Sequence, residues 1–345
     1  MKKVVVLSGG SGNTALLEGL YKNKDYNVNI IVNAEDHGKS TGICSEVTNT
    51  MGVSDIRKNH YKVFKNSPKY KDIDKDYADA IHDLFEGRHD IDPSNVEDLI
   101  AIREKLKAVG FGWAFDYVDA FFERREVHNY EFKNFNIMNI VYSQMYTEYG
   151  YEETHKKICS CLGIEDSVVL NSFDRIKLIA QTESGHLLED EGDIVEWCNP
   201  NDKIKNTYHI GHHFGLNERA INLIKDADVI IISSGTFWSS IYPTLQYLDF
   251  YEYVNESTAN KIWIMNTEED KDAYGVTSQD FILKMVELGL DLSEFTILEN
   301  INAVDSLKMP CVLNEDIIET ELGNNNGKHD PKLLARAIDY IIENE

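Results

Sequence analysis

Short apolar runs alternate with helical patterns along the chain, and the alternation begins at the first residues. Residues 4–7 are all apolar and mostly β-branched, which predicts a buried strand. The turn Ser-Gly-Gly-Ser-Gly-Asn follows at residues 8–13, and residues 14–20 have the leucine spacing of a helix. A second apolar run at residues 28–33 is followed by Ala34-Glu35-Asp36. This order of strand, turn, helix and strand is typical of a parallel α/β sheet.

The same pattern returns in the second half of the chain. Residues 228–233 form another apolar run, and Ser234-Gly235-Thr236 follow it directly. The next apolar run ends in Asn266. Because the carboxyl ends of parallel strands meet at one edge of a sheet, we expect these polar ends to lie at the same edge. The sequence therefore predicts an α/β protein with a Rossmann-like, doubly wound, mostly parallel sheet, in which residues 1–345 form a single domain.

A helical stretch interrupts this pattern. Residues 66–129 contain three amphipathic helical patterns, which we interpret as an insertion within the domain. The insertion is either a lid over the ligand-binding loops or a cap that stabilises only itself or a dimer. We also expect a polar loop over residues 37–42, a helix over residues 134–149 and a strand over residues 194–197. A further helix is expected over residues 237–248, kinked or split by Pro243.

The charge balance excludes some classes of partner. The chain has 59 acidic and 34 basic residues, a formal net charge of −25. A general nucleic-acid binder needs basic surface that neutralises phosphates, and docking on anionic membranes needs the same. No apolar run approaches the roughly 18 residues of a membrane span, and the apolar run at the start is too short for a signal peptide. We therefore expect a cytoplasmic protein that binds neither nucleic acid nor membranes.

The five cysteines are scattered, and the only close pair, Cys159 and Cys161, has C-x-C spacing. An odd number of cysteines without C-x-x-C spacing predicts reduced thiols and no zinc site.

The glycine turn at residues 8–13 is the first candidate for chemistry. Glycines let the backbone approach an anion closely, and a helix start offers N–H groups to phosphate. The sequence GGSGN matches neither the G-x-G-x-x-G nor the Walker pattern, so a tight turn without a ligand remains the alternative.

Five segments together resemble the 2-phospho-L-lactate transferase and gluconeogenesis-factor family (CofD-like and YvcK-like proteins). These segments are KVVVLSGGSGNTALLEGL, VNAEDHGKSTG, SDIRKNH, VIIISSGTFWSSIYPTL and residues 266–280, and they occur in the order seen in the family. The similarity covers nearly the whole chain. It implies a Rossmann-like fold. In the transferase branch it implies Mg²⁺-dependent transfer of a phospholactyl group from a guanosine-diphosphate-activated donor to a deazaflavin alcohol. In the other branch it implies a regulator that binds uridine-diphosphate sugars without catalysis.

The resemblance also implies which residues form the site. Asp36 would bind Mg²⁺ and, together with Asp55, would be a catalytic carboxylate. The residues implied in nucleotide binding come from several segments and are Gly9, Gly10, Ser11, Gly12, Asn13, Lys39, Ser40, Arg57, Asn134, Ser234, Gly235, Thr236 and Asn266.

Two departures from the family pattern leave the donor base and the acceptor open. The loop that usually reads Asp-Asp-Gly-Gly-Ser-Ser-Gly is here Glu-Asp-His-Gly-Lys-Ser-Thr-Gly, at residues 35–42. Of the Gly-His-x-x-Gly-Asn helix start, only Asn134 is present.

Three functions are therefore compatible with the sequence. The first is a transferase of phosphorus-containing groups that uses a nucleotide-diphosphate-activated donor. The second is a nonenzymatic sensor of nucleotide sugars. The third is a dinucleotide-binding oxidoreductase, in which Glu35 or Asp36 would hold a ribose, although the glycine spacing disfavours it. Each function takes a nucleotide ligand, and a homo-oligomer remains open.

Overall fold

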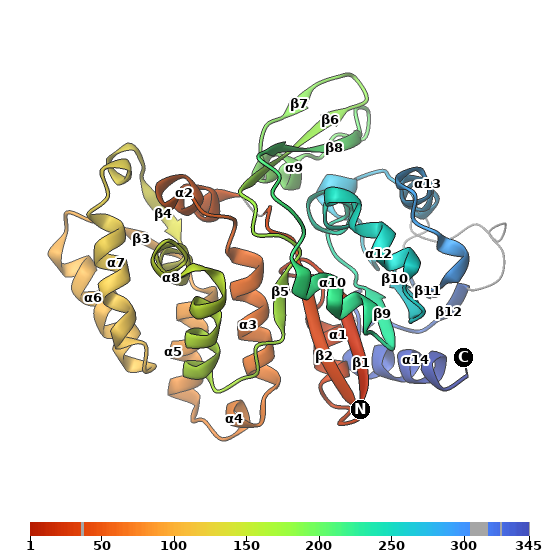
Figure 1. Ribbon diagram of the computed structural model, residues 1–345, viewed down its shortest axis with the longest axis horizontal. Helices are drawn as coiled ribbons and strands as arrows, with labels where there is room; N and C mark the ends of the chain where they lie inside the picture. The colour runs from red at the N-terminus through yellow and green to blue at the C-terminus, as the bar shows by residue number, and fades with distance from the viewer. Residues whose placement is uncertain (36–37, 304–316, 325, 345) are drawn as a thin grey trace. The chain divides into compact units, whose positions relative to one another are not determined.

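The computed structural model describes residues 1–35, 38–303, 317–324 and 326–344 (Figure 1). The chain forms two units, which are described separately. The sheet unit comprises Met1–Asn33, Ser167–Ser172 and Lys177–Glu345, and the helical unit comprises Ala34–Asp166 and Phe173–Ile176. In the described part of the chain, no helix is both long enough and apolar enough to cross a membrane.

Seven parallel strands form the centre of the sheet unit. Their spatial order is β12-β11-β10-β9-β1-β2-β5, and every neighbouring pair is parallel. The sequence-based prediction of a Rossmann-like, mostly parallel α/β sheet is confirmed. The strands are β1 (Lys2–Leu7), β2 (Tyr26–Val32), β5 (Val168–Leu170), β9 (Val229–Ile232), β10 (Asn260–Ile264), β11 (Phe295–Asn300) and β12 (Ile317–Thr320).

The strand order reverses direction at β1. The chain first proceeds from β1 to β2 and β5 on one side, and later places β9, β10, β11 and β12 on the other. Leu7 at the end of β1 is in register with Ile232 at the end of β9. The segments that follow these two strands therefore start side by side, at the position where ligands bind in open α/β sheets.

Helices cover the sheet because its strands are apolar on both faces. α1 (Thr14–Leu20) packs against α14 (Pro331–Asn344). One face of the sheet contributes Val5, Ile230 and Trp263 to a large buried cluster that also includes Phe250 and Phe281. The helices that supply this cluster are α10 (Glu218–Lys225), the π-helix η3 (Phe237–Ile241), α11 (Tyr242–Gln246), α12 (Phe250–Glu256) and α13 (Ser278–Leu288).

The helix predicted over residues 237–248, with a kink or split at Pro243, is divided next to that residue. A π-helix precedes α11, and a short 3₁₀ turn, η4 (Tyr247–Asp249), ends it. Leu248 and Asp249 have φ values of 47° and 57°, in the left-handed region, which ends the α-helical path.

A three-stranded sheet, ordered β7-β6-β8, forms a smaller part of the same unit. Its strands are β6 (Ile176–Thr182), β7 (Leu187–Leu188) and β8 (Ile204–Gly211). The strand predicted over residues 194–197 is wrong, because α9 (Glu191–Glu196) occupies that place. The Asp190 side chain accepts the N–H of Asp193 and caps this helix. The short apolar run that follows was interpreted as a strand because this cap was not recognised.

The helical unit contains α2 to α8. Its elements are α2 (Lys39–Thr48), α3 (Ser54–Asn66), α4 (Pro68–Lys71), α5 (Lys75–Glu86), β3 (His89–Ile91), α6 (Val96–Ala108), η1 (Gly112–Ala114), α7 (Phe115–Phe122), η2 (Arg125–Asn129), β4 (Phe132–Phe135) and α8 (Ile137–Leu162). Residues 66–129 are largely helical, as predicted, but they are only part of a unit that begins at Ala34 and reaches Asp166. The division into one domain with an insertion stays a prediction.

Two local predictions in this unit are wrong. Residues 39–42, expected in a loop, form the first turn of α2, and Gly38 occupies the position before it. The helix expected from residue 134 begins at Ile137, because β4 pairs with β3 before it. α8 then continues past Tyr149 through a kink at Gly150, where φ is 72°.

Candidate functional site

Two loops leave the carboxyl edge of the seven-stranded sheet at the point where the strand order reverses. The first loop comprises residues 8–13, after β1, and the second comprises residues 233–236, after β9. The N–H of Ser8 donates to the carbonyl of Ile31 at 3.0 Å, and the N–H of Ser233 donates to the carbonyl of Leu7 at 3.0 Å. These bonds extend the strand ladders by one residue, so both loops start from a fixed backbone.

The two loops touch at Gly12. The Ser234 hydroxyl donates to the carbonyl oxygen of Gly12 at 3.3 Å. A Cβ atom at Gly12 would lie 2.3 Å from the Ser234 carbonyl oxygen and 2.7 Å from the Gly235 Cα. Because both contacts are to backbone, only glycine permits this approach. The structure thus brings together the two loops that the sequence placed at one edge.

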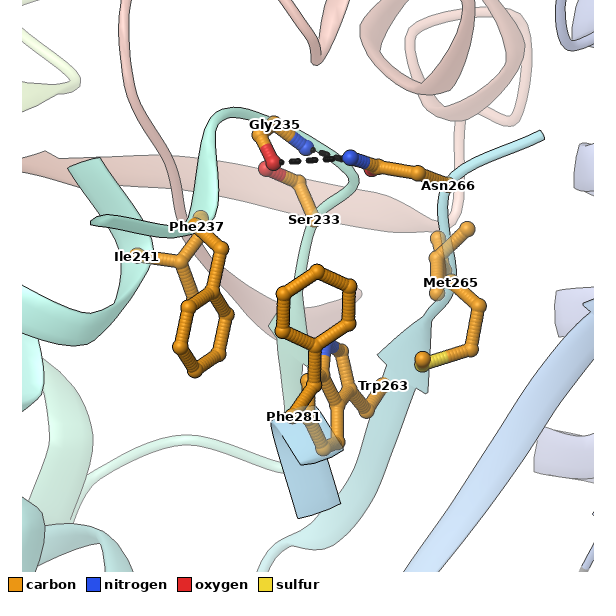
Figure 2. Close-up of a pocket in the computed structure, with 9 residues that line it drawn as sticks. Ser233, Gly235, Phe237, Ile241, Trp263, Met265, Asn266 and Phe281 are labelled. Carbon is orange, nitrogen blue, oxygen red and sulfur yellow. Dashed lines mark hydrogen bonds between the residues drawn. The ribbon is translucent and has the colours of Figure 1, made fainter. Parts of the chain in front are cut away.

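Asn266 holds the second loop from the adjacent strand end. Its Oδ1 accepts the N–H of Gly235 at 2.9 Å, and its Nδ2 donates to the Gly235 carbonyl at 3.0 Å (Figure 2). The same Nδ2 also donates to Asp270 Oδ2 at 2.7 Å. Both backbone groups of Gly235 are therefore engaged by one side chain, which positions the loop.

A small cavity lies beneath the second loop. Its volume is about 20 Å³, and its apolar wall includes Phe237, Trp263 and Phe281 (Figure 2). Such a volume holds about one water molecule, so this cavity is too small for a nucleotide. A ligand at this edge would contact the loops rather than enter this cavity.

Two carboxyl groups follow Asn266, the half-buried Asp270 and the buried Asp272. Burial, with Asp270 as a like charge, raises the pKa of Asp272 to about 8. Burial also raises the pKa of Asp270, and the charge of Glu268 adds to the effect. Asp272 Oδ2 accepts the N–H of Trp238 at 3.2 Å, at the start of η3. Both carboxyl groups therefore bind a proton more readily than an exposed aspartate does.

His329 is a further residue at this edge, which the sequence did not indicate. Its Nδ1 lies 3.4 Å from the Ser234 hydroxyl. Burial lowers the pKa of His329 to about 4, so the imidazole is neutral at pH 7. A bridge between Gly323 and His329 fixes its segment. His329 is a single histidine in a polar segment, and no spacing pattern in the sequence predicts that it lies beside Ser234.

Ser40 and Thr41, in the helical unit, lie where α2 and α8 meet. The hydroxyl of Ser40 accepts hydrogen bonds from Arg88 Nη1 at 2.9 Å and from Asn139 Nδ2 at 3.1 Å. Asn139 Nδ2 also lies 3.3 Å from the Thr41 hydroxyl. Of these residues only Ser40 was a candidate from the sequence. Asn139 lies in the first turn of α8, three residues after the cap Asn136. A polar residue at this place in a helix is the sequence feature that could have identified Asn139 as a candidate.

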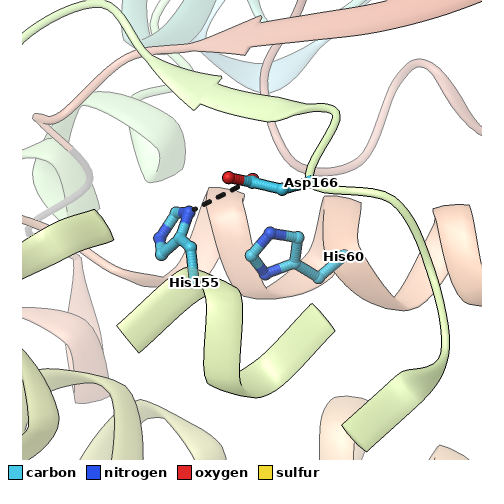
Figure 3. A group of neighbouring side chains, drawn as sticks. All are labelled: His60, His155 and Asp166. Atoms are coloured by element: carbon cyan, nitrogen blue, oxygen red, sulfur yellow. Dashed lines mark ion pairs between the residues drawn. The ribbon is translucent and has the colours of Figure 1, made fainter. Parts of the chain in front are cut away.

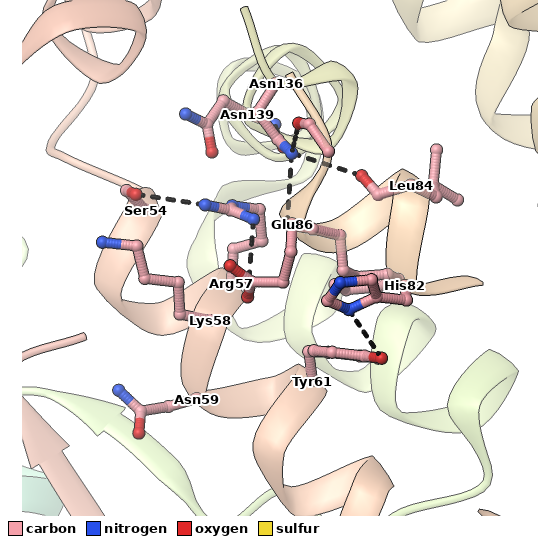
Figure 4. A network of polar contacts seen from close by, with 12 residues as sticks. Ser54, Arg57, Lys58, Asn59, Tyr61, His82, Leu84, Glu86, Asn136 and Asn139 are labelled. Atoms are coloured by element: carbon pink, nitrogen blue, oxygen red, sulfur yellow. Dashed lines mark hydrogen bonds and ion pairs between the residues drawn. The ribbon is translucent and has the colours of Figure 1, made fainter. Parts of the chain in front are cut away.

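Arg57 is completely buried in the same unit. Its Nη2 lies 3.3 Å from the Ser54 hydroxyl, and its Nη1 lies 3.9 Å from Glu86 Oε1, as Figure 4 shows. It therefore connects α3 to α5. Asp55, in the first turn of α3, pairs with Lys58 at 3.5 Å. Burial, reinforced by Lys58, lowers the pKa of the neighbouring Lys62 to about 7.

Asn136 stabilises the ends of two helices in this network. Its Nδ2 donates to the carbonyls of Phe85 at 3.1 Å and Gly87 at 2.9 Å, at the end of α5. Its Oδ1 accepts the N–H of Asn139 and caps α8 (Figure 4).

The remaining predicted site residues are located as follows. Asn134 lies on β4 with a φ of 53°, and its N–H donates to Asp90 Oδ1 at 2.8 Å. It does not take part in the Ser40–Asn139 contact. Asp36 lies outside the described residues, as does the side chain of Lys39. The first and second loops and Asn266 belong to the sheet unit, whereas Ser40, Asp55, Arg57 and Asn134 belong to the helical unit. The assignment of these residues to a nucleotide site stays a prediction.

Comparison with known proteins shows consistent similarity over most of the chain. The sequence profile of the family described as 2-phospho-L-lactate transferase CofD matches residues 4–311. A protein of Thermoanaerobacterium thermosulfurigenes with the provisional name gluconeogenesis factor is 23% identical over 99% of this chain and 97% of its own length. An Aquifex aeolicus protein of the same provisional name is 24% identical, over 55% of this chain and 64% of its own length, which is just under two thirds.

The fold also occurs in a solved structure. A crystal structure of a UPF0052 family protein from Bacillus halodurans has a TM-score of 0.71 to this chain at 18% identity. The similarity covers 98% of each chain and shows a shared fold.

Proposed function

Because the chain belongs to the CofD family, we propose that it binds a nucleoside-diphosphate-linked ligand at the carboxyl edge of the seven-stranded sheet. The observation that carries this proposal is the contact of two small-residue loops where the strand order reverses. Open α/β sheets bind ligands in this position. The backbone of the first loop touches the second loop at Gly12, and Asn266 fixes the second loop from the next strand.

The composition of the first loop suits a diphosphate. Gly9, Gly10 and Gly12 carry no side chain that would keep a phosphate away from the backbone. Recognition by backbone N–H groups requires no cationic side chain, which is consistent with a chain of net charge −25. Ser11 is exposed between these glycines, so its side chain would meet the ligand first.

The reaction that we propose is the transfer of a phosphate-linked group. An acceptor hydroxyl attacks the phosphorus distal to the nucleoside, a new P–O bond forms, and the bridging P–O bond of the diphosphate breaks. The nucleoside monophosphate leaves, and the hydroxyl proton passes to a base. Asp36 and Asp55 remain the carboxylates proposed for this chemistry from the family resemblance.

Mg²⁺ is the ion that the family resemblance implies. The donor chemistry at the sheet edge fits it, because Asp270 is a half-buried carboxyl at this edge, and carboxylate oxygens are ligands that Mg²⁺ prefers. Asp270 would supply one carboxylate ligand to such an ion. The role of Asp36 as a Mg²⁺ ligand stays a proposal from the family resemblance alone. When bound, Mg²⁺ offsets the negative charge that develops on the leaving phosphate.

A nonenzymatic nucleotide-sugar sensor is the second candidate function. The matched proteins of Thermoanaerobacterium and Aquifex are provisionally named gluconeogenesis factors, and the family resemblance implies such a sensor for that branch. It would use the same two loops without an acceptor.

Substitution of Ser11 tests the proposed binding site. Ser11→Asp adds a negative charge at an exposed position of the first loop, and it should weaken binding of a diphosphate by about tenfold or more through charge repulsion. Isothermal titration with GDP, UDP, UDP-sugars and NAD, each with and without Mg²⁺, measures this change. Ser160→Asp is the matched control, because Ser160 is exposed on α8 in the helical unit. Equal nucleotide affinity in parent and Ser11→Asp would refute the proposed site.

Turnover separates the two candidate functions. A transferase should release nucleoside monophosphate from a guanosine-diphosphate-linked phospho-hydroxy acid only when an acceptor alcohol is present. Tight binding of a UDP-sugar without any such release would instead establish the sensor.

A further inference from the structure

Two buried histidines and one carboxylate converge inside the helical unit. His60 lies on α3, His155 lies on α8 beyond the kink at Gly150, and Asp166 lies in the segment after α8 (Figure 3). Both imidazoles are fully buried. One nitrogen of each histidine and one Asp166 oxygen all lie within 4.8 Å of one another. These side chains thus have types and positions suited to a metal ion.

Two tyrosines on the first half of α8 orient the histidines. The hydroxyl of Tyr142 lies 2.8 Å from His60 Nδ1, and that of Tyr146 lies 2.6 Å from His155 Nε2. A metal-binding histidine is usually held through its second ring nitrogen in this manner. The second nitrogens of the two rings are His60 Nε2 and His155 Nδ1.

Each of these two nitrogens faces a further ligand atom. His60 Nε2 lies 3.6 Å from Cys159 Sγ. His155 Nδ1 lies 3.9 Å from Asp166 Oδ1, and Figure 3 shows this pair. Cys159 follows His155 by four residues, so both project from the same face of α8. The thiol of Cys159 is buried and not in a disulfide.

Two of the spacings between these ligand atoms can be compared with those of a tetrahedral site. Zn–N and Zn–O bonds of about 2.0 to 2.1 Å and Zn–S bonds of about 2.3 Å place neighbouring ligand atoms about 3.3 to 3.7 Å apart. The sulfur–nitrogen pair already has this spacing, and the nitrogen–oxygen pair exceeds it slightly. The ligand atoms of His60, His155 and Asp166 lie within 4.8 Å of one another, so metal binding requires the side chains, including that of Cys159, to move closer together.

We propose that His60, His155 and Asp166, with Cys159 as the fourth ligand, form a structural site for Zn²⁺ or another borderline divalent ion. Imidazole and thiolate ligands select such ions over Mg²⁺, which prefers oxygen. The ion connects α3, α8 and the segment that follows α8. It is separate from the Mg²⁺ proposed for the sheet edge, and its existence does not depend on the proposed function.

Metal binding by the untagged full-length protein tests this site. After treatment with a chelator, the parent should take up one Zn²⁺ per chain, measured by competition with a chromophoric chelator, and its melting temperature should rise. Asp166→Asn, which preserves side-chain shape, should weaken Zn²⁺ binding by about tenfold or more. Tyr146→Phe should weaken it by about 10- to 100-fold, because it removes the group that orients His155.

A histidine elsewhere in the same unit provides the control. His82 is exposed on α5 and bonds to the Tyr61 hydroxyl at 3.1 Å, so His82→Gln should bind Zn²⁺ like the parent. Circular dichroism shows whether each variant retains its helices. No uptake of Zn²⁺ by the parent, or parent-like affinity in folded Asp166→Asn, would overturn the proposal and leave a hydrogen-bonded histidine cluster.

Cobalt provides a spectroscopic check on the fourth ligand. Co²⁺ bound to the parent should show a thiolate charge-transfer band, which should disappear in Cys159→Ser while Co²⁺ remains bound. Identical spectra in the two proteins would exclude Cys159 from the site.

Discussion

Asp272 and His329, both at the sheet edge, titrate far from their ordinary pKa values because they are buried. Asp272 has a pKa of about 8, since burial and the charge of Asp270 disfavour its ionised form. His329 has a pKa of about 4, since burial disfavours its charged form. At pH 7, therefore, both groups are mainly neutral. In an exposed position, an aspartate with its ordinary pKa of 3.8 would be charged at this pH.

Asp272→Asn should make the stability of the protein less dependent on pH. In the unfolded chain this carboxyl loses its proton above its ordinary value of 3.8, whereas the folded protein retains the proton up to about pH 8. Folding then takes up a proton between these values, so the free energy of unfolding falls as pH rises from about 4 to about 8. The slope from this one group is at most about 1.4 kcal/mol per pH unit. The asparagine cannot ionise, and its amide oxygen can still accept the Trp238 N–H.

Urea denaturation between pH 5 and pH 8 measures this effect. The variant should be more stable than the parent at pH 8, and the difference should shrink toward pH 5. Asp116→Asn removes an exposed carboxylate on α7 and should leave the parent's pH dependence unchanged. A parallel pH dependence in the parent and Asp272→Asn would contradict the raised pKa.

At the scale of elements, the two loops at the sheet edge contact one another through their backbones, with no side chain between them at Gly12. The first loop approaches the second so closely at Gly12 that the Ser234 carbonyl oxygen would be 2.3 Å from an added Cβ. Gly235 is different, because its nearest neighbour to an added Cβ is Ile241 Cδ1 at 3.7 Å. Two glycines at the same edge thus have different steric requirements.

Gly12→Ala and Gly235→Ala should therefore behave differently. The first variant forces the backbones of the two loops apart and should lower the free energy of unfolding by about 1 to 3 kcal/mol, as overpacking does. The second variant adds a methyl group at ordinary contact distance and should stay within about 1 kcal/mol of the parent. Denaturation midpoints in urea measure both. If Gly12→Ala is as stable as the parent, the contact between the loops is not as close as described.

At the scale of the whole molecule, two units divide the chain, and each contains part of the predicted site. The sheet unit carries both loops and Asn266, and the helical unit carries Ser40, Asp55 and Arg57. Family membership covers residues 4–311 and therefore extends over segments of both units. Ligand binding should thus be followed in every segment of the chain rather than at the glycine turn alone.

Hydrogen exchange with and without nucleotide provides that measurement. Exchange in the loops at residues 8–13 and 233–236 should slow on binding, since the proposed ligand covers them. The prediction that residues 66–129 form a lid implies slower exchange in α5, α6 and α7 as well. Protection of the two loops with unchanged exchange in these helices would instead identify a cap.

The sequence alone determined the type of fold and the positions of the polar strand ends. Strands buried on both faces must be apolar over their length, so β1, β2, β9 and β10 could be recognised as short apolar runs. The loops after β1 and β9 could be assigned to one edge because parallel strands share their direction. Helix caps were less visible, and this explains the wrong strand at residues 194–197.

Only the tertiary structure decided which of these segments touch. Gly12 meets Ser234 across more than two hundred residues, and no local spacing records that contact. His329 beside Ser234, Asn139 beside Ser40, and the His60–His155–Asp166 cluster each join segments distant in sequence. Local patterns reveal which face of an element is buried, because burial follows the period of the helix or strand. Which elements become neighbours is set by the packing of the whole chain, so these polar contacts could not be predicted from the sequence.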